Sequence, residues 1–444
     1  MVEGSLQVIG LTSFSVLRTA RIALATLIAI SSMSGLWAVP VPTANADEYS
    51  GTPDTYLALV PKLKPGDQLS LAPGIYREGL PLRAVRGEEG RAIVIEGPAS
   101  GAPAVFLARE RHNTISLRES SHVVIRNLVL DGADLGVDAV KAEWKSGLVH
   151  HVTLEGLVIV RHGIDQGVNG ISTKTPTAFW TIRNNVIIGA GTGMYLGDSD
   201  GSAPFVAGII EGNLIVDTVG YNLQIKHQRG RPTLNDLPLS PQRTVIRGNF
   251  FSKAAKASTG TFARPNLLLG HFPLNGPGSS DEYLVAENVF YANPVESLMQ
   301  AEGNVVIFRN IFVNPVGNAV SVQPHNDVPR HIEIARNFIV AKGYGIQIQG
   351  AHPGYAQVVF GNRDLSGGTT VGESSINGRA TSGDNLEKAF QEWLTMDLAA
   401  RSNNSSADQP IAAALRIACG RRVTAGSTVP AGLIPPAHFL CQQL

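Results

Sequence analysis

The chain has 444 residues, of which 43% are apolar and 16% are charged, and it contains 47 glycines and 26 prolines. This composition is typical of a globular chain rich in strands and turns, and it excludes a largely disordered one. Lysines plus arginines and aspartates plus glutamates both number 36. Because the net charge is zero, no overall field favours nucleic acid or an anionic membrane, and electrostatic selectivity must be local.

The first 46 residues have the pattern of a secretory signal peptide. Arg18 and Arg21 precede an apolar run over 22–30, and a small-residue cleavage site ends at Ala46. An uncleaved membrane anchor is the alternative, but serines and prolines shorten the apolar stretch. We therefore expect a secreted or periplasmic protein that has no membrane span after cleavage.

A short helix and a first strand follow. Thr52 is a candidate N-cap and Pro53 suits the first helical position, so we expect a helix that covers one end of the domain. The sequence Lys64-Pro65-Gly66-Asp67 predicts a turn, and the alternating residues 68–71 predict a strand.

Nine segments then repeat one sequence pattern, in which a β-rich run is followed by Asn or Gly and a second apolar run. The markers are 22 to 39 residues apart, and they are Asn127, Gly156, Asn185, Asn213, Asn249, Asn288, Asn310, Asn337 and Asn362. Such a period, without a helical pattern between the markers, indicates a stacked solenoid. We predict an all-β parallel β-helix of about ten to twelve rungs over 47–365, in which the asparagines form a hydrogen-bonded ladder.

Two intervals in this repeat are long. Their extra residues lie at 229–241 and 258–280, and insertions in a solenoid project as loops from one face. We expect both insertions to form the walls of a binding groove.

The last segment, 366–444, has a different character. Helical spacing over 384–401 and 407–419 predicts a small helical cap at the C-terminus. Cys419 and Cys441 are the only cysteines, and in an exported chain they would form a disulfide that closes the tail.

Polar residues recur at similar offsets after one strand of successive repeats. Stacking would bring these side chains together on one face, and they are Asp198, Lys226, His227, His271, Glu302, Gln323, His325, Asp327 and His352. A groove of this kind on a secreted solenoid fits an extended polysaccharide.

If the polymer contains uronic acid, β-elimination needs a cation beside the carboxylate, a base for the C5 proton and an acid for the leaving O4. Lys226, Arg264 and Arg330 could neutralise the carboxylate, and His271, His325 or Lys226 could transfer protons. Glycoside hydrolysis instead needs two carboxylic acids, and the candidates for that reaction are Asp198, Asp200, Glu302 and Asp327.

No P-loop, Rossmann fingerprint, HExxH or CxxC motif is present, and calcium is the one candidate cofactor. The oxygen-rich segment that contains Asp198 and Asp200 makes a calcium site possible, although such a cluster is more often an ordinary turn.

The opening rung PGDQLSLAPGIY, at 65–76, resembles that of secreted right-handed parallel β-helix proteins, among them the family-six polysaccharide lyases such as chondroitinase B and alginate lyase. The resemblance covers roughly 52–362 and implies a right-handed helix. The lyases use a lysine and an arginine on neighbouring rungs, with calcium nearby, and Lys226 matches the lysine by type. The segment QPHND, from Gln323 to Asp327, is similar to the Asp-Pro-His-Asp motif of mannuronan C5-epimerases, which implies a base role for His325.

We therefore predict a monomeric, secreted lyase that acts on an extended acidic polysaccharide. The predicted catalytic residues are Lys226, His227, His271 and His325. The predicted substrate-binding residues are Arg264, Gln300, Glu302, Gln323, Asn326, Asp327 and Arg330. A non-catalytic carbohydrate-binding or cell-envelope protein, a glycoside hydrolase and a C5-epimerase on the same scaffold are the alternatives.

Overall fold

The computed structural model describes residues 46–143, 147–254, 257–350, 354–355 and 357–371. The predicted signal peptide up to residue 45, the Cys419–Cys441 disulfide, the C-terminal cap beyond residue 371 and part of the segment around His352 lie outside these residues. No helix among the described residues is long and apolar enough to cross a membrane.

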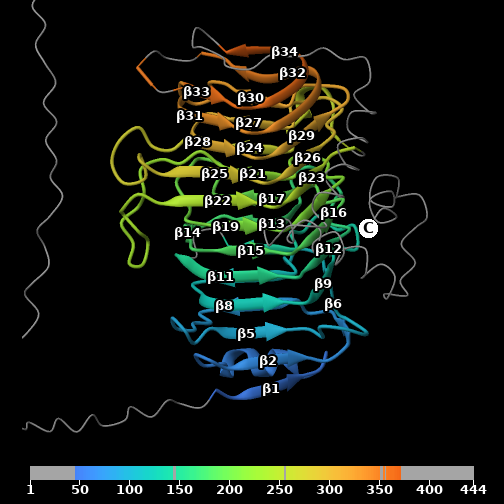
Figure 1. Ribbon diagram of the computed structural model, residues 1–444. Helices are drawn as coiled ribbons and strands as arrows, with labels where there is room; N and C mark the ends of the chain where they lie inside the picture. Colours follow the sequence, from blue (N-terminus) through green and yellow to red (C-terminus); the bar gives the residue numbers. More distant parts are fainter. Residues whose placement is uncertain (1–45, 144–146, 255–256, 351–353, 356, 372–444) are drawn as a thin grey trace, which may run out of the picture. The chain divides into compact units, whose positions relative to one another are not determined.

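Strands of the described chain stack in three ladders (Figure 1). The first ladder has twelve strands in the order β1 (Glu48–Gly51), β2 (Gln68–Leu71), β5 (Ile93–Glu96), β8 (Ser121–Arg126), β11 (Val149–Glu155), β15 (Thr181–Arg183), β19 (Ile209–Glu211), β22 (Arg243–Arg247), β25 (Glu282–Ala286), β28 (Gly303–Phe308), β31 (Arg330–Ala335) and β33 (Gln357–Phe360). The short strands β14 (Thr177–Ala178) and β18 (Phe205–Val206) lie beside it.

The other two ladders belong to one sheet. The second ladder consists of β3 (Gly74–Tyr76), β6 (Ala104–Leu107), β9 (Leu128–Asp131), β12 (Val158–Val160), β16 (Val186–Ile188), β20 (Leu214–Val216), β23 (Phe250–Ser252), β26 (Val289–Tyr291) and β29 (Ile311–Asn314). The third consists of β4 (Leu80–Arg83), β7 (Ile115–Arg118), β10 (Val140–Ala142), β13 (Asn169–Thr173), β17 (Thr192–Leu196), β21 (Leu223–Ile225), β24 (Leu267–Leu269), β27 (Met299–Ala301) and β30 (Val320–Val322). Both end on the long strands β32 (Phe338–Ile348) and β34 (Arg363–Val371).

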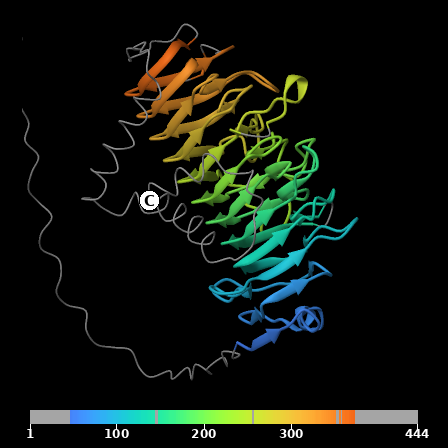
Figure 2. The ribbon, with the colours of Figure 1, turned by 90° about the vertical axis from the view of Figure 1, so that its right-hand side faces the viewer.

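Neighbouring strands of each ladder pair in parallel, and from β2 onward each circuit of the chain adds to all three ladders (Figure 2). This arrangement is a parallel β-helix, so the predicted fold class is confirmed. Strand β34 reaches Val371, which lies beyond the expected domain end at residue 365.

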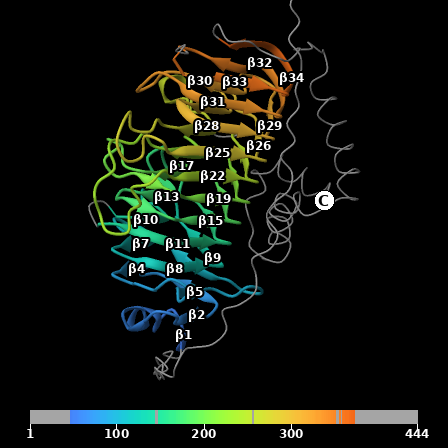
Figure 3. The same ribbon diagram turned by 60° about the vertical axis from the view of Figure 1, so that its left-hand side comes forward.

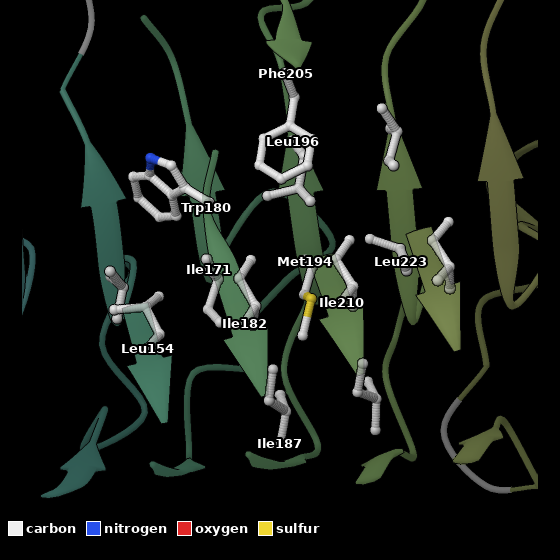
Figure 4. Close-up of a cluster of buried hydrophobic side chains, with 14 of the residues drawn as sticks. Leu154, Ile171, Trp180, Ile182, Ile187, Met194, Leu196, Phe205, Ile210 and Leu223 are labelled. Atoms are coloured by element: carbon white, nitrogen blue, oxygen red, sulfur yellow. The ribbon is translucent and has the colours of Figure 1, made fainter. Parts of the chain in front are cut away.

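Inward-facing apolar side chains fill the space between the ladders. Leu154, Ile182 and Ile210 occupy matching positions on β11, β15 and β19, and all three are fully buried (Figure 4). On the second ladder, Phe251 and Phe290 stack with their ring centroids 4.9 Å apart. Each fully buried side chain of this size contributes roughly 1.5–3 kcal/mol of transfer free energy, which makes the alternating apolar pattern the main source of stability.

The predicted asparagine ladder is present. In each of its six steps the side-chain amide of one asparagine donates to the side-chain oxygen of the next, through Asn185, Asn213, Asn249, Asn288, Asn310, Asn337 and Asn362. The same oxygens also accept the backbone N–H of the preceding asparagine, for example from Asn213 to Asn249. The ladder therefore satisfies backbone and side-chain groups that are buried at the bend between the first and second ladders.

Two of the predicted markers lie outside this ladder. Asn127 and Gly156 occupy the preceding position, where the backbone is left-handed with φ of 59° and 61°. Leu128 and Leu157 fill the ladder position in those rungs. In these two rungs the predicted marker lies one residue before the ladder position. Asn and Gly also favour a left-handed backbone, so the sequence pattern does not distinguish the two positions.

The N-terminal helix begins later than predicted. Helix α1 spans Tyr56–Leu59 and continues into the 3₁₀-helix η1 (Val60–Lys62). Thr55, and not Thr52, holds the N-cap position. The Thr52 carbonyl accepts the backbone N–H groups of Thr55 and Tyr56 in a turn that precedes the helix. Strand β1, which the sequence did not suggest, precedes this turn, whereas the predicted strand at 68–71 is confirmed as β2.

We expect Asn249→Ala to destabilise the protein, because it leaves the buried N–H groups of Asn213 without their acceptor. Each buried polar group that loses its partner costs about 1–3 kcal/mol. The measurement is the urea midpoint of unfolding. The control is Asn127→Gly, which keeps the left-handed turn outside the ladder; equal losses for the two variants would contradict a stabilising role for the ladder.

Candidate functional site

A groove lies along the outer face of the third ladder. Figure 3 labels β4, β7, β10, β13 and β17 of this ladder. Its main hollow has a volume of about 740 Å³ and includes residues of β10, β13, β17 and β21 and of the loops beside them. A second hollow of about 190 Å³ shares Arg111 and Asn113 with the first and continues toward the N-terminal rungs. The two hollows therefore form one elongated depression, which suits an extended ligand.

The main hollow is strongly basic. Among its described lining residues the one carboxylate is Asp138, and the cations are Arg111, Lys141, Lys174, Lys226 and Arg264. Because these charges line a partly enclosed surface, they attract anions although the whole chain has no net charge.

Asp138 is fully engaged by its neighbours. Its side chain is 5% exposed, and it accepts hydrogen bonds from the backbone and side-chain amides of Asn169 and from the hydroxyl of Ser172. The ammonium of Lys141 lies 3.1 Å from the same carboxylate. Asp138 thus neutralises the charge of Lys141 and holds β13 in place. The other cations of the groove remain available to an anionic ligand.

Two lysines lie on either side of one tyrosine. The ammonium of Lys174 is 3.4 Å from the ring centroid of Tyr195, and that of Lys226 is 5.8 Å from the same centroid. The phenol of Tyr195 donates a hydrogen bond to the hydroxyl of Ser199 at 3.2 Å. The groove therefore brings two ammonium groups and a phenol together at its centre.

Burial shifts the pKa of all three groups. It is the main cause that lowers the pKa of Lys174 to about 8; the carboxylates of Asp198 and Asp138 oppose this shift, and the positive charges of Lys141 and Lys226 act in the same direction as burial. Burial also lowers the pKa of Lys226, although the carboxylates of Glu302 and Asp198 oppose this shift. Burial raises the pKa of the Tyr195 phenol, so this group keeps its proton.

Glycines make room for Lys226. The strand register aligns Gly197 and Gly270 with Lys226 in the rungs before and after it. A Cβ atom on Gly270 would lie 2.2 Å from the backbone nitrogen of His227, and a Cβ on Gly197 would lie 3.2 Å from the Cβ of Lys226. Larger residues at these positions would crowd the lysine stem and displace the backbone.

The second insertion does form a wall of the groove. Its 3₁₀-helix η2 (Gly260–Phe262) contacts the groove through the Phe262 carbonyl, which accepts a hydrogen bond from the side chain of Gln166. The Arg264 carbonyl accepts hydrogen bonds from the buried ammonium of Lys253 at 2.6 Å and from the amide of Asn293 at 2.9 Å. These contacts hold Arg264 in the lining, as predicted from the insertion.

The first insertion, at 229–241, does not line the groove, contrary to our expectation. Its Leu237 packs against Ala178 and Val206 beside the first ladder. Its Arg231 forms a buried ion pair with Asp281. The loop lies elsewhere because an apolar side chain and a buried ion pair attach it to a different face.

The predicted histidines form a neighbouring cluster around Glu302. This carboxylate is 2% exposed and accepts the backbone N–H groups of His271 at 2.9 Å, His325 at 2.8 Å and Asn326. The rings of His227 and His271 stack with centroids 5.6 Å apart. The sequence therefore grouped these residues correctly, but the lining of the main hollow includes Lys226 and none of the three histidines.

Several other predicted residues have partners within the protein. Arg330 forms an ion pair with Asp327 at 2.6 Å. The amide of Gln300 donates to Glu296, and the amide oxygen of Gln323 accepts from Ser321. These contacts give the side chains structural roles, and neither Gln300 nor Gln323 lines the main hollow.

The two aspartates suggested for calcium point to different partners. Asp200 accepts the backbone N–H of Ser202 and lies 3.9 Å from the guanidinium of Arg229. Hydrogen bonds from Ser202 lower its pKa. Asp198 accepts the backbone N–H of Ser199. Among the described residues, neither aspartate belongs to a group of three or more His, Cys, Asp or Glu side chains close enough to share a metal ion.

Sequence reasoning missed Lys174, Tyr195 and Tyr221. Lys174 directly follows β13 just as Lys226 directly follows β21, and this equivalence was the available signal. The equivalence does not appear as a constant offset from the asparagine markers, because the loops before these strands differ in length. Tyr195 lies within a strand at an outward position, which periodicity alone does not distinguish from a structural residue.

No known protein family and no curated protein matches the sequence. Solved structures similar to this one include an alginate lyase from Paenibacillus sp. str. FPU-7, with 17% identity, a TM-score of 0.46, and coverage of 76% of this chain and 98% of that one. A lacto-N-biosidase from Eubacterium ramulus has 11% identity and a TM-score of 0.39, covering 76% and 68%. The A-module of a mannuronan C-5 epimerase from Azotobacter vinelandii has 16% identity and a TM-score of 0.39, covering 71% and 91%. These similarities concern the fold and do not select a reaction.

We expect Glu302→Gln to loosen the loops at His271 and His325, because an amide offers one acceptor oxygen to N–H groups that now share two. Hydrogen bonds to a charged group contribute about 1.5–3 kcal/mol each. The measurement is hydrogen exchange at His271, His325 and Asn326, which should become faster. Glu333→Gln on the outer side of β31 is the control; unchanged exchange in Glu302→Gln would contradict this role.

Proposed function

We propose that the protein binds a linear polysaccharide containing uronic acid in the groove of the third ladder and cleaves it by β-elimination. The observation that carries this proposal is the position of Lys174 and Lys226 on either side of Tyr195, within a main hollow whose described lining has one carboxylate, which is ion-paired. A cationic, elongated groove is complementary to a linear polyanion.

The three central groups match the three requirements of the elimination. Lys226 neutralises the uronate carboxylate, which acidifies the C5 proton. Lys174, in its neutral form, takes that proton, and the C5–H electrons form the C4=C5 double bond while the C4–O4 bond breaks. The phenol of Tyr195 donates its proton to the departing O4. Arg264 and Arg111 bind carboxylates of neighbouring sugars.

The lysines have different roles because their environments differ. A pKa of about 8 leaves about a tenth of Lys174 neutral at pH 7, which is suitable for a base that acts near neutrality. Burial lowers the pKa of both lysines and Asp198 opposes this for both, but the carboxylate of Glu302 favours the charged form of Lys226 alone. Tyr195 remains protonated because burial raises its pKa, and it is therefore an acid and not a base.

Hydrolysis is a poorer match to the same groove. A glycoside hydrolase needs two carboxyl groups on either side of the scissile bond. In the main hollow the one carboxylate of the described lining, Asp138, is already engaged by Lys141, Asn169 and Ser172. The second hollow adds Glu78 and Glu143, which form ion pairs with Arg109 and Arg118. The groove therefore favours elimination over hydrolysis.

The direct test incubates the secreted protein with alginate, pectate and chondroitin and follows the ultraviolet absorbance of the unsaturated uronate. At least one polymer should give this product, and Tyr195→Phe and Lys174→Ala should lower kcat by about 10²–10⁴-fold. Lys342→Ala, at an exposed position of β32, is the matched control and should retain full activity. Binding without any unsaturated product would identify a carbohydrate-binding protein and overturn the proposed reaction.

The pH dependence of the same reaction should identify the base. Lys174 must lose its proton to act, so kcat/KM should rise as the pH rises through about 8 and then reach a plateau. Lys174→Arg keeps the positive charge but remains protonated, and it should abolish this rise together with the activity. An unchanged pH profile in an active Lys174→Arg variant would show that another group is the base.

A further inference from the structure

A cluster of three histidines lies outside the groove, on the first ladder. His122 belongs to β8, and His150 and His151 belong to β11. Because Ser121 pairs with His150 and Val123 pairs with Val152, His122 and His151 occupy matching positions in adjacent rungs. The proposed polysaccharide chemistry uses none of the three.

An unusual backbone brings the three rings together. His122 and His151 have φ angles of 51° and 52°, in the left-handed region that non-glycine residues rarely adopt. Successive side chains of a regular strand point to opposite faces, but a left-handed residue interrupts this alternation. His150 and His151 can therefore face the same side although they are adjacent in sequence.

The ring nitrogens are close enough to share one ion. One nitrogen from each histidine can be chosen so that all three lie within 4.8 Å of one another, and the two Nδ1 atoms of His150 and His151 are 2.8 Å apart. The rings of His122 and His151 are stacked, with centroids 4.4 Å apart. Two imidazoles bound to one zinc ion at 2.0–2.1 Å have nitrogens roughly 3.3 Å apart in a tetrahedral site, so small ring rotations would be sufficient.

The surroundings favour the uncharged forms of His150 and His151. Burial, followed by the proximity of His151, lowers the pKa of His150 to about 4, and burial also lowers that of His151. The neutral ring is the form that binds metal. Asp236, from the first insertion, and Glu89 are the nearby carboxylates that act on these histidines, and neither joins the group of potential ligands.

We propose that His122, His150 and His151 form a binding site for one borderline divalent cation of the Zn²⁺, Ni²⁺ or Cu²⁺ type. Imidazole nitrogen is a preferred ligand for these ions, whereas Ca²⁺ and Mg²⁺ require oxygen ligands. Three histidines leave a fourth tetrahedral position for water. The ion joins β8 to β11, and it stabilises the folded protein by binding the folded state alone.

The test uses the full secreted chain, freed of metal by a chelator, and titrates it with Zn²⁺ and separately with Ca²⁺. Calorimetry should give one Zn²⁺ per chain, and Zn²⁺ should raise the melting temperature. Ca²⁺ should not bind to these three histidines. Co²⁺ gives a second readout, because its visible spectrum reports coordination by imidazole.

The variants locate the site. His122→Gln and His151→Phe should each weaken Zn²⁺ binding at least about tenfold, comparable to the loss of a metal-site contact. His151→Phe preserves folding in particular, because Phe179 occupies the matching left-handed position in the next rung and stacks on His151 at 4.6 Å. The matched control is His331→Gln on β31, which also has a left-handed backbone, with φ of 50°, and should bind Zn²⁺ normally.

Zn²⁺ affinity that is the same in His122→Gln and His151→Phe as in the parent chain would overturn the proposal. So would the absence of any saturable Zn²⁺ binding. Loss of binding in His331→Gln as well would show a general effect on folding and would also contradict the assignment. Because these readouts do not use polysaccharide, their result is independent of the proposed elimination reaction.

Discussion

Parallel, in-register stacking of the rungs is the constraint on which the rest of this structure depends. Each residue of a strand lies about 4.8 Å from its equivalent in the next rung, so every position is repeated as a column along the ladder. A column is stable only if its members tolerate one another at that distance. Asparagine does so best, because each amide can donate to the next, and the steps from Asn185 to Asn362 satisfy buried groups that would otherwise lack partners.

The same distance explains how cations are arranged in the groove. Two ammonium groups in adjacent rungs would repel each other, and in the partly buried groove water would screen that repulsion poorly. The column that contains Lys174 and Lys226 has Gly197 between them and Gly270 after them. This spacing leaves room for the ring of Tyr195 between the two lysine side chains, which gives the groove its local positive charge without direct contact between like charges.

The sequence predicted the fold well because the fold depends on patterns that the sequence displays directly: alternation, turn residues and a repeated asparagine. It predicted the site only in part. Lys226 and Arg264 line the groove as expected, but Lys174 and Tyr195 could not be placed without the strand register, since the loops before them vary in length. Glu302 was grouped with the right neighbours, yet its role as an acceptor for backbone N–H groups depends on burial that no local pattern reveals.

The histidine column illustrates the opposite case to the lysine column. His122 and His151 stack directly, without an intervening glycine. The stacking continues to Phe179 in the next rung, which shows that the column accepts flat side chains on a left-handed backbone. A column of stacked rings needs no metal for its stability, but His150 adds a third nitrogen from the same strand at hydrogen-bond distance. This hydrogen bond already gives the nitrogen of His150 a structural role, and in the proposed site the same nitrogen is the third ligand of the cation.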